Sequence, residues 1–373
     1  MRTNALHFPL NLNLDLNLHL ILILHLILGA WSHAGELDSL PPPFAVHGLP
    51  YIYYTPETDW AFGATAVGTF RLTDSLALYP SSITIDAYYT VRKQYKVTLA
   101  PELYLDDNRY LLSTSIEVGR IVDRFWGSGP RSEDSDSTEY VKNIVRIQAR
   151  AQVLLLKSLK AGVIYEYERS TVTEKEVNPW LVSRSVRGSD GTVASGMGIA
   201  VSWDSRDNLF FPSSGSFHQI EYAVYGRFLG ATDEFRRTLI DLRWYISLAA
   251  RHTLAAQGVG LVIGGAAPFG RLAPLGGDMI MRGYYTGRYR DNILLAAQIE
   301  YRVMVFSRFG AVAFIGAGDV APSFSTFGMG TLKPSCGGGL RFVLDPREKL
   351  TLRLDVGIGR GTDAIYLAIK EAF

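Results

Sequence analysis

Residues Pro274–Arg290 read PLGGDMIMRGYYTGRYR and interrupt an otherwise regular alternation of apolar and polar residues. The stretch is rich in glycine and carries Arg282, Arg288 and Arg290, and it shows neither the period of a strand nor that of a helix. Clean alternating segments lie on both sides of it. We therefore predict a long loop whose core, Met281–Tyr284, folds back into the structure while the strands close around it.

The chain from Leu49 onward alternates with a period of two. In Leu350–Gly359, leucine, valine and isoleucine occupy every second position, and Thr, Arg, Asp and Gly fill the positions between them. Ile83–Arg92 and Val145–Val153 repeat the pattern. Successive side chains of a strand point to opposite faces, so each segment has one apolar face and one polar face that can carry charge. This pattern predicts an all-β fold.

Three properties of these strands favour a barrel over a soluble β-sandwich. The strands number about sixteen, an even count as in outer-membrane barrels, and they run to roughly ten residues, the length that a tilted strand needs to cross a bilayer. Tyrosines gather near the strand ends, where a membrane-interface girdle would place them. A sandwich would more often use shorter strands. We predict a 16-stranded antiparallel transmembrane β-barrel.

The connections between the predicted strands alternate in length. Every second connection is short, which suits the periplasmic turns of a barrel, and the others include all the longest. The longest are 122–141, 171–192, 264–291 and 320–334. The alternation predicts extracellular loops at one end and periplasmic turns at the other.

The N-terminus has the features of a signal peptide. Arg2 gives a basic start, an apolar run follows at Leu18–Leu28, and Ser32 and Ala34 are the small residues of a cleavage site. The run is too short to span a membrane. We predict a signal peptide over 1–34, a short N-terminal segment over 35–48, and one barrel domain over 49–373.

Composition argues against several classes of function. The net charge of +1 gives no general attraction to nucleic acid. The single cysteine, Cys336, rules out an internal disulfide framework and a multi-cysteine metal site. The histidines are scattered without a serine or cysteine partner, so we predict no enzyme, no catalytic residue and no cofactor. Glu166 and Glu168 are predicted to form charge networks with arginine-bearing strands.

Five motifs, in order, resemble those of the outer-membrane protein assembly superfamily, the BamA/TamA group or bacterial surface antigen family. The resemblance is clearest over Val193–Phe373. The segment Met281-Arg282-Gly283-Tyr284 looks like the family's Val-Arg-Gly-Phe/Tyr motif in the sixth extracellular loop. The other four are Leu275-Gly276-Gly277, the turn from Asp204-Ser205-Arg206-Asp207-Asn208 to Phe211-Pro212-Ser213-Ser214-Gly215, Gln298–Tyr301 and Phe314–Val320. Because little chain precedes the first strand, the resemblance implies the subgroup that lacks periplasmic POTRA domains.

The resemblance implies that Arg282 reaches into the lumen and contacts acidic groups on the wall. Glu300 is the expected partner, because it lies on the polar face of its strand. In the family, a second acidic residue on the wall also contacts this arginine, and it usually lies two residues after a phenylalanine. Here Gly316 occupies that position after Phe314, and Asp319 is the remaining candidate. Without the resemblance, an exposed loop arginine remains the alternative for Arg282.

Two further sets of residues are predicted to have structural roles. Asx-type hydrogen bonds, a proline-fixed φ and a glycine with positive φ predict a rigid periplasmic turn formed by Asp204, Arg206, Asp207, Pro212 and Gly215. A metal site is the alternative there. The acidic run 132–139 is predicted to be a solvated loop, and calcium binding is the alternative for it.

Phe373 resembles the terminal aromatic residue of the signal by which barrels are recognised for assembly. The last predicted strand runs from Asp363 to Phe373, and in it Phe373 shares a face with Ile365, Leu367 and Ile369. Glu371 would share that face too, where an apolar residue is usual.

The resemblance implies a protein of the bacterial outer membrane that assists insertion or translocation of proteins or lipids. Its expected partners are outer-membrane lipid, substrate polypeptides and a periplasmic partner protein, and no nucleic acid. A passive diffusion pore or a secretion channel for a separate partner is the alternative. A lipolytic or proteolytic barrel is a third, weaker one.

Overall fold

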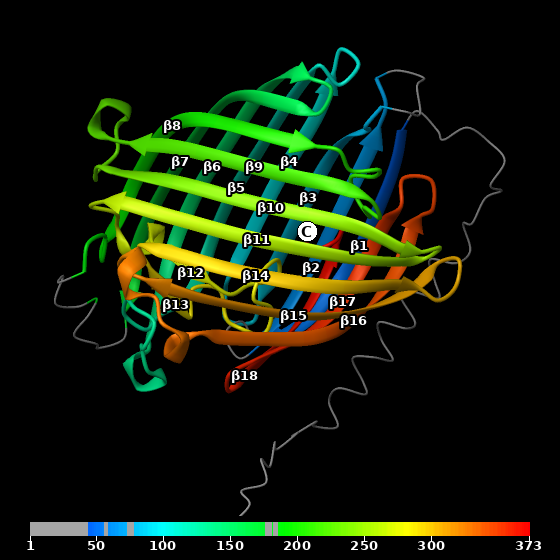
Figure 1. Ribbon diagram of the computed structural model, residues 1–373. Helices are drawn as coiled ribbons and strands as arrows, with labels where there is room; N and C mark the ends of the chain where they lie inside the picture. The colour runs from blue at the N-terminus through cyan, green and yellow to red at the C-terminus, as the bar shows by residue number, and fades with distance from the viewer. Residues whose placement is uncertain (1–43, 56–58, 73–77, 176–180, 182–185) are drawn as a thin grey trace, which may run out of the picture. The chain divides into compact units, whose positions relative to one another are not determined.

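The computed structural model describes residues 44–55, 59–72, 78–175, 181 and 186–373. Sixteen strands form one antiparallel sheet, and each pairs with the next large strand along the chain, as Figure 1 shows. The strands are β1 (Phe44–Thr55), β2 (Asp59–Phe70), β3 (Ser81–Thr90), β4 (Tyr95–Leu105), β5 (Tyr110–Phe125), β6 (Thr138–Leu156), β7 (Leu159–Lys175), β8 (Gly191–Asp204), β9 (Gly215–Tyr225), β10 (Phe235–Ala249), β11 (His252–Gly265), β14 (Ile293–Met304), β15 (Phe309–Ala321), β16 (Lys333–Asp345), β17 (Leu350–Gly359) and β18 (Thr362–Ile369). The predicted all-β fold with sixteen antiparallel strands is confirmed.

Smaller elements lie in the connections. A separate two-stranded sheet, β12 (Ala273–Leu275) with β13 (Tyr289–Asp291), lies between β11 and β14 in sequence. The 3-10 helices are η2 (Asp134–Asp136), η3 (Arg227–Leu229), η4 (Phe269–Arg271), η5 (Phe324–Thr326) and η6 (Met329–Thr331). In the described parts of the chain, no helix has the length and apolar character needed to cross a membrane.

The burial of side chains is the reverse of that in a water-soluble protein. On β14, Glu300 and Arg302 are 0% and 1% exposed, whereas Leu295 and Ile299 are 40% and 47% exposed. The apolar face therefore points outwards, and the charged face lines an enclosed interior, which we call the lumen. This arrangement suits lipid outside and polar groups inside.

The sheet curves until its first and last strands lie close together, as the blue and red ribbons of Figure 1 show. His47 of β1 lies 3.2 Å from Asp345, and Arg71, just after β2, binds Glu348 at 2.8 Å. Val67 of β2 is in the same apolar cluster as residues of β17 and β18. Among the described residues, no backbone pairing joins β1 to β18.

The two ends of the sheet differ in their connections. The loop end carries the long segments 126–137, 226–234, 266–292 and 322–332, together with the partly described 176–190. The turn end carries the short connections 106–109, 157–158, 250–251, 305–308 and 346–349, and the longer turn 205–214. The four longest connections, 126–137, 176–190, 266–292 and 322–332, therefore lie at one end, as the alternation of connection lengths predicts, and the connection 71–80 lies with 205–214 at the other.

Two predicted boundaries need correction. β1 begins at Phe44, so residues 44–48 of the predicted N-terminal segment belong to the first strand. β18 ends at Ile369 and not at Phe373, because Lys370 has a φ of 80° and breaks the strand. The predicted signal peptide and its cleavage after Ala34 lie outside the described residues.

Candidate functional site

The connection between β11 and β14 folds into the lumen. β12 and β13 pair as the stem of a hairpin, and residues 281–284 at its tip are all buried. Met281 and Gly283 both have positive φ, 56° and 103°, and this left-handed backbone lets the tip turn tightly. The position of the tip matches the predicted loop core.

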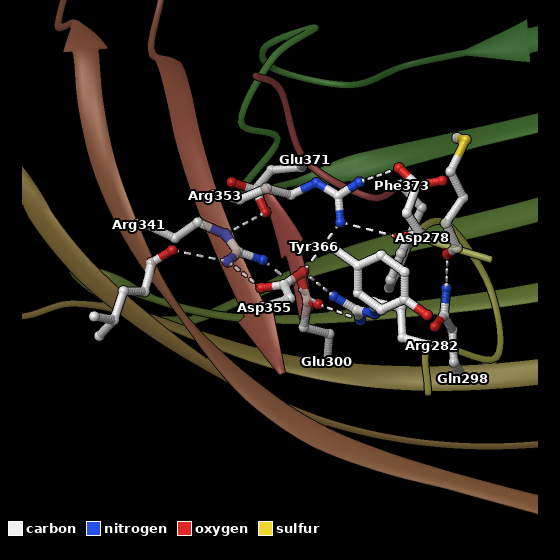
Figure 2. Close-up of polar contacts among 12 residues, drawn as sticks. Asp278, Arg282, Gln298, Glu300, Arg341, Arg353, Asp355, Tyr366, Glu371 and Phe373 are labelled. Carbon is white, nitrogen blue, oxygen red and sulfur yellow. Dashed lines mark hydrogen bonds and ion pairs between the residues drawn. The ribbon is translucent and has the colours of Figure 1, made fainter. Parts of the chain in front are cut away.

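Arg282 is fully buried at this tip and lies against charged groups of the wall, as Figure 2 shows. Its Nη2 donates to Glu300 Oε2 at 2.6 Å, and its Nη1 donates to Asp355 Oδ2 at 2.7 Å. The guanidinium also stacks on Phe314, 3.5 Å from the ring centroid. Two charge-assisted hydrogen bonds and a ring face thus compensate the loss of water around the cation.

The second acid is Asp355 of β17, which the sequence reasoning missed. Asp319 instead accepts a hydrogen bond from Lys333 Nζ at 2.5 Å, and Gly316 leaves its family position without an acid. Asp319 lies three residues beyond Gly316, nearer the loop end, so the prediction that it is a wall partner needs correction. The polar face of β17 already contained the signal, since Arg353 and Asp355 alternate there with leucine and valine.

Arg282 belongs to a larger ionic cluster in the lumen. Arg302 Nε donates to Glu300 at 2.8 Å, and Arg341 Nη1 donates to Asp355 at 2.5 Å. Four arginines and four carboxylates make up the cluster: Arg282, Arg302, Arg341 and Arg353 with Asp278, Glu300, Asp355 and Glu371. Four positive and four negative charges cancel, and this reduces the cost of burying seven of them away from bulk water, since only the side chain of Asp278 is half-exposed.

Glycines let the loop tip lie directly on the backbone of β17. A Cβ on Gly357 would lie 2.6 Å from the backbone nitrogen of Gly283, and a Cβ on Gly283 would lie 2.6 Å from that of Ile358. The amide of Gly283 also donates to the hydroxyl of Tyr366 at 3.0 Å. No side chain can stand between the two backbones, so these glycines set how closely the loop approaches the wall.

The glycine run 337–339 of β16 makes room for the groups that contact Arg282. A Cβ on Gly337 would lie 2.4 Å from the ring of Phe314, and a Cβ on Gly339 would lie 2.1 Å from Asp355 Oδ1. These glycines therefore let Phe314 and Asp355 lie directly against the backbone of β16.

A second arginine, Arg271 of η4, attaches the same loop to a different part of the lumen wall, on β7 and β9. It donates to Glu168 at 3.1 Å, to Glu166 at 2.7 Å and to the hydroxyl of Tyr225 at 2.9 Å. Burial by itself would lower the pKa of Arg271, but Tyr225 and the two glutamates raise it above its usual value. Glu166 and Glu168 thus lie in the kind of arginine network that the sequence predicted.

The turn 205–214 has the local geometry expected of a rigid turn. Arg206 Nη2 binds Asp204 at 2.7 Å, and Pro212 is buried. Gly215 has a φ of 94°, and a Cβ there would lie 2.1 Å from the carbonyl oxygen of Ser205. Burial lowers the pKa of Arg206, but the hydrogen bond and charge of Asp204 outweigh this and raise it.

Asx-type hydrogen bonds complete the turn. Asp207 Oδ1 accepts from the backbone of residues 213 and 214, and Asn208 Oδ1 accepts from that of residues 210 and 211. Asn208 also donates to the carbonyl oxygen of Glu348 at 3.1 Å, so the turn reaches across to the segment before β17. Within the described chain, no group of three or more His, Cys, Asp or Glu residues could hold a metal ion.

Phe373 does not continue the last strand. Its side chain is 3% exposed and packs in the lumen against Tyr245 and Ala255. The prediction that it shares a face with Ile365, Leu367 and Ile369 is therefore corrected, because the chain turns inwards at Lys370. Its role as an assembly signal stays a prediction.

Comparison with known families and structures decides the family. Residues 81–358 match the Omp85 superfamily domain. The chain belongs to the Omp85 superfamily. Omp85 barrels reside in the bacterial outer membrane, and they insert or translocate proteins without being enzymes. The sequence resemblance to this family is thereby confirmed.

Solved Omp85-type barrels share the fold at low sequence identity. BamA from Haemophilus ducreyi lacking POTRA domains 1–3 has a TM-score of 0.56 and 12% identity, over 88% of this chain and 69% of that one. CdiB from Acinetobacter baumannii has a TM-score of 0.55 and 10% identity, and covers 87% of this chain. CdiB from Escherichia coli has a TM-score of 0.56 and 11% identity, and covers 90%. This Omp85 chain spans 59% and 62% of the two CdiB chains. No curated protein matched it in sequence.

Proposed function

We propose that this Omp85 barrel assists the insertion or translocation of polypeptides, or of lipids, at the outer membrane. The single observation that carries the proposal is the burial of Arg282 between Glu300 and Asp355, which keeps the loop inside the lumen. A passive diffusion pore needs an open lumen. A barrel that handles large substrates needs an obstruction that can move.

The contents of the lumen support this choice over the pore. Besides the loop, the segment 371–373 and the turn 205–214 contribute buried side chains. The remaining space includes a polar cavity of about 250 Å³, lined in part by Glu102, Arg150 and Lys160. A cavity of this size holds several water molecules and no folded substrate.

The outer edges of β1 and β18, which pair with no other strand among the described residues, also support the proposal. An exposed strand edge can template another chain through backbone hydrogen bonds. The loop end then faces outwards and the turn end faces the periplasm, where a partner protein would deliver the substrate. The partner's contact surface would include the turn 205–214.

The conductance of the purified barrel separates the two functions. In planar bilayers the intact protein is expected to be mostly closed, and deletion of 281–284 is expected to produce a large, steady conductance because the tip leaves the lumen. Arg227→Ala, on the exposed η3 helix, is the control and should behave like the intact protein. A large permanent conductance of the intact protein would favour the diffusion pore.

Depletion of the protein tests the insertion or translocation function directly. We expect a subset of outer-membrane or exported polypeptides to fall in abundance, and quantitative proteomics of the outer-membrane fraction measures this. Expression of the intact protein or of Arg227→Ala should restore the profile, and Arg282→Ala should not. An unchanged profile after depletion would contradict the proposal.

A further inference from the structure

The segment 371–373 occupies a defined site on the lumen wall, beside the ionic cluster shown in Figure 2. Glu371 accepts hydrogen bonds from Arg341 Nε at 2.7 Å and from the hydroxyl of Thr351 at 2.9 Å. Arg302 Nη2 donates to the backbone oxygen of Phe373 at 2.9 Å. The wall thus holds one carboxylate and one backbone oxygen two residues apart.

The ring of Phe373 fills an apolar part of the same site. It packs against Tyr245 and Ala255, and the guanidinium of Arg302 lies 5.2 Å from its centroid. Arg302 also lies over the ring of Phe211, at 5.7 Å. The groups that contact the segment come from β10, β11, β14, β16 and β17, so the paired sheet holds them in place whether or not the site is filled.

The segment is joined to the sheet by the shortest of the sixteen strands. β18 has eight residues, the fewest of the sixteen strands, and its described pairing is with β17 alone. Lys370, which links β18 to the segment, has a φ of 80°, a backbone conformation that residues other than glycine seldom adopt. Release of the segment would relieve this strain and leave the wall intact.

We propose that the wall groups around Glu371 and Phe373 form a peptide-binding site that the chain fills with its own residues. Once vacated, the site takes an acidic–x–aromatic segment of another polypeptide. The identity of that ligand rests on the proposed function, because only a barrel that handles polypeptides brings such segments into its lumen. Arg302 and Arg341 also bind Glu300 and Asp355, so the site shares its arginines with the partners of Arg282.

Peptide binding to the purified full chain in detergent tests the site. The probe is a fluorescein-labelled peptide Lys-Glu-Ala-Phe, followed by fluorescence anisotropy. We expect it to bind the double variant Glu371→Gln, Phe373→Ala about tenfold more tightly than the intact protein, whose own segment competes. A labelled Lys-Gln-Ala-Ala peptide is the matched control and should not bind. Adding Thr351→Val to the double variant should weaken binding of the first peptide.

Equal, weak binding of the two peptides by the double variant would overturn the proposal. A second measurement covers failure of that variant to fold. In a Cys336→Ser background, the thiol introduced by Ala372→Cys should react slowly with a water-soluble maleimide, because Ala372 is fully buried. Adding Glu371→Gln should speed the reaction about tenfold. Equal rates in the two proteins would show that the contacts of Glu371 do not hold the segment, and this too would overturn the proposal.

These measurements are independent of the proposed function. Both use purified protein, so loss of peptide binding would leave the depletion result standing. Conversely, an unchanged proteome after depletion would contradict the proposed function and the ligand class inferred from it. It would not contradict the binding of the segment 371–373 to the wall.

Discussion

Arg282→Ala is expected to lower the free energy of unfolding by about 3 kcal/mol, the lower end of the cost of breaking a buried ion pair. The lower end applies because Glu300 and Asp355 keep Arg302 and Arg341 as partners. The variant should also conduct ions, since the loop tip loses both its hydrogen bonds to the wall. Urea titration of the barrel in lipid vesicles, followed by the gel mobility of the folded form, measures the stability.

Arg282→Lys is the matched variant. Lysine keeps the charge but cannot donate to Glu300 and Asp355 from one planar group, so an intermediate loss is expected. If Arg282→Ala and Glu300→Ala each left both stability and conductance unchanged, the loop would not be held by this contact.

Gly357→Ala should displace the loop tip while every charge is kept. The added methyl group would lie 2.6 Å from the backbone nitrogen of Gly283, a distance that backbone atoms cannot accommodate without moving. We expect a loss of about 2 kcal/mol, typical of overpacking, and a rise in conductance. The same urea titration and bilayer recordings provide the measurement.

Gly258→Ala is the control for this change. Gly258 lies in β11, and a Cβ there would meet no atom within 4 Å, so stability and conductance should stay as in the intact chain. Because Gly357→Ala and Arg282→Ala disturb the same contact, their effects should not add in the double variant. Additive losses would mean that the glycine and the arginine act separately.

The sequence was sufficient for the parts of the site that lie on one strand. Once the family resemblance placed Arg282 in the lumen, Glu300 could be assigned as its partner because alternation places it on the polar face of β14, beside Gln298 and Arg302. Asp355 could not be assigned to Arg282, because that pairing depends on how far the loop reaches across the lumen towards β17. Loop depth is set by the opposed glycines Gly283 and Gly357, and no local periodicity encodes it.

The last residues show the same limit. The alternation predicts a final strand that runs to Phe373, and this strand places Glu371 on an apolar face. A charged residue there is inconsistent with the pattern. The inward turn at Lys370 removes it, because Glu371 then binds Arg341 in the lumen. A positive φ at a lysine follows from tertiary contacts and not from the preference of the residue itself. The charge of Glu371 on a predicted apolar face was therefore the signal that the strand does not continue to Phe373.

The sharing of Glu300 and Asp355 between several arginines affects how readily the loop tip can leave the lumen. When the loop tip withdraws, each carboxylate still has a wall arginine, and Arg282 gains water, so withdrawal leaves no charge stranded. The contact then behaves as a two-state gate with a finite bias. If the whole of the ~3 kcal/mol expected for Arg282→Ala opposed withdrawal of the loop, the open state would be populated for less than roughly one per cent of the time. Recordings of the intact barrel would show rare, brief openings against a closed baseline.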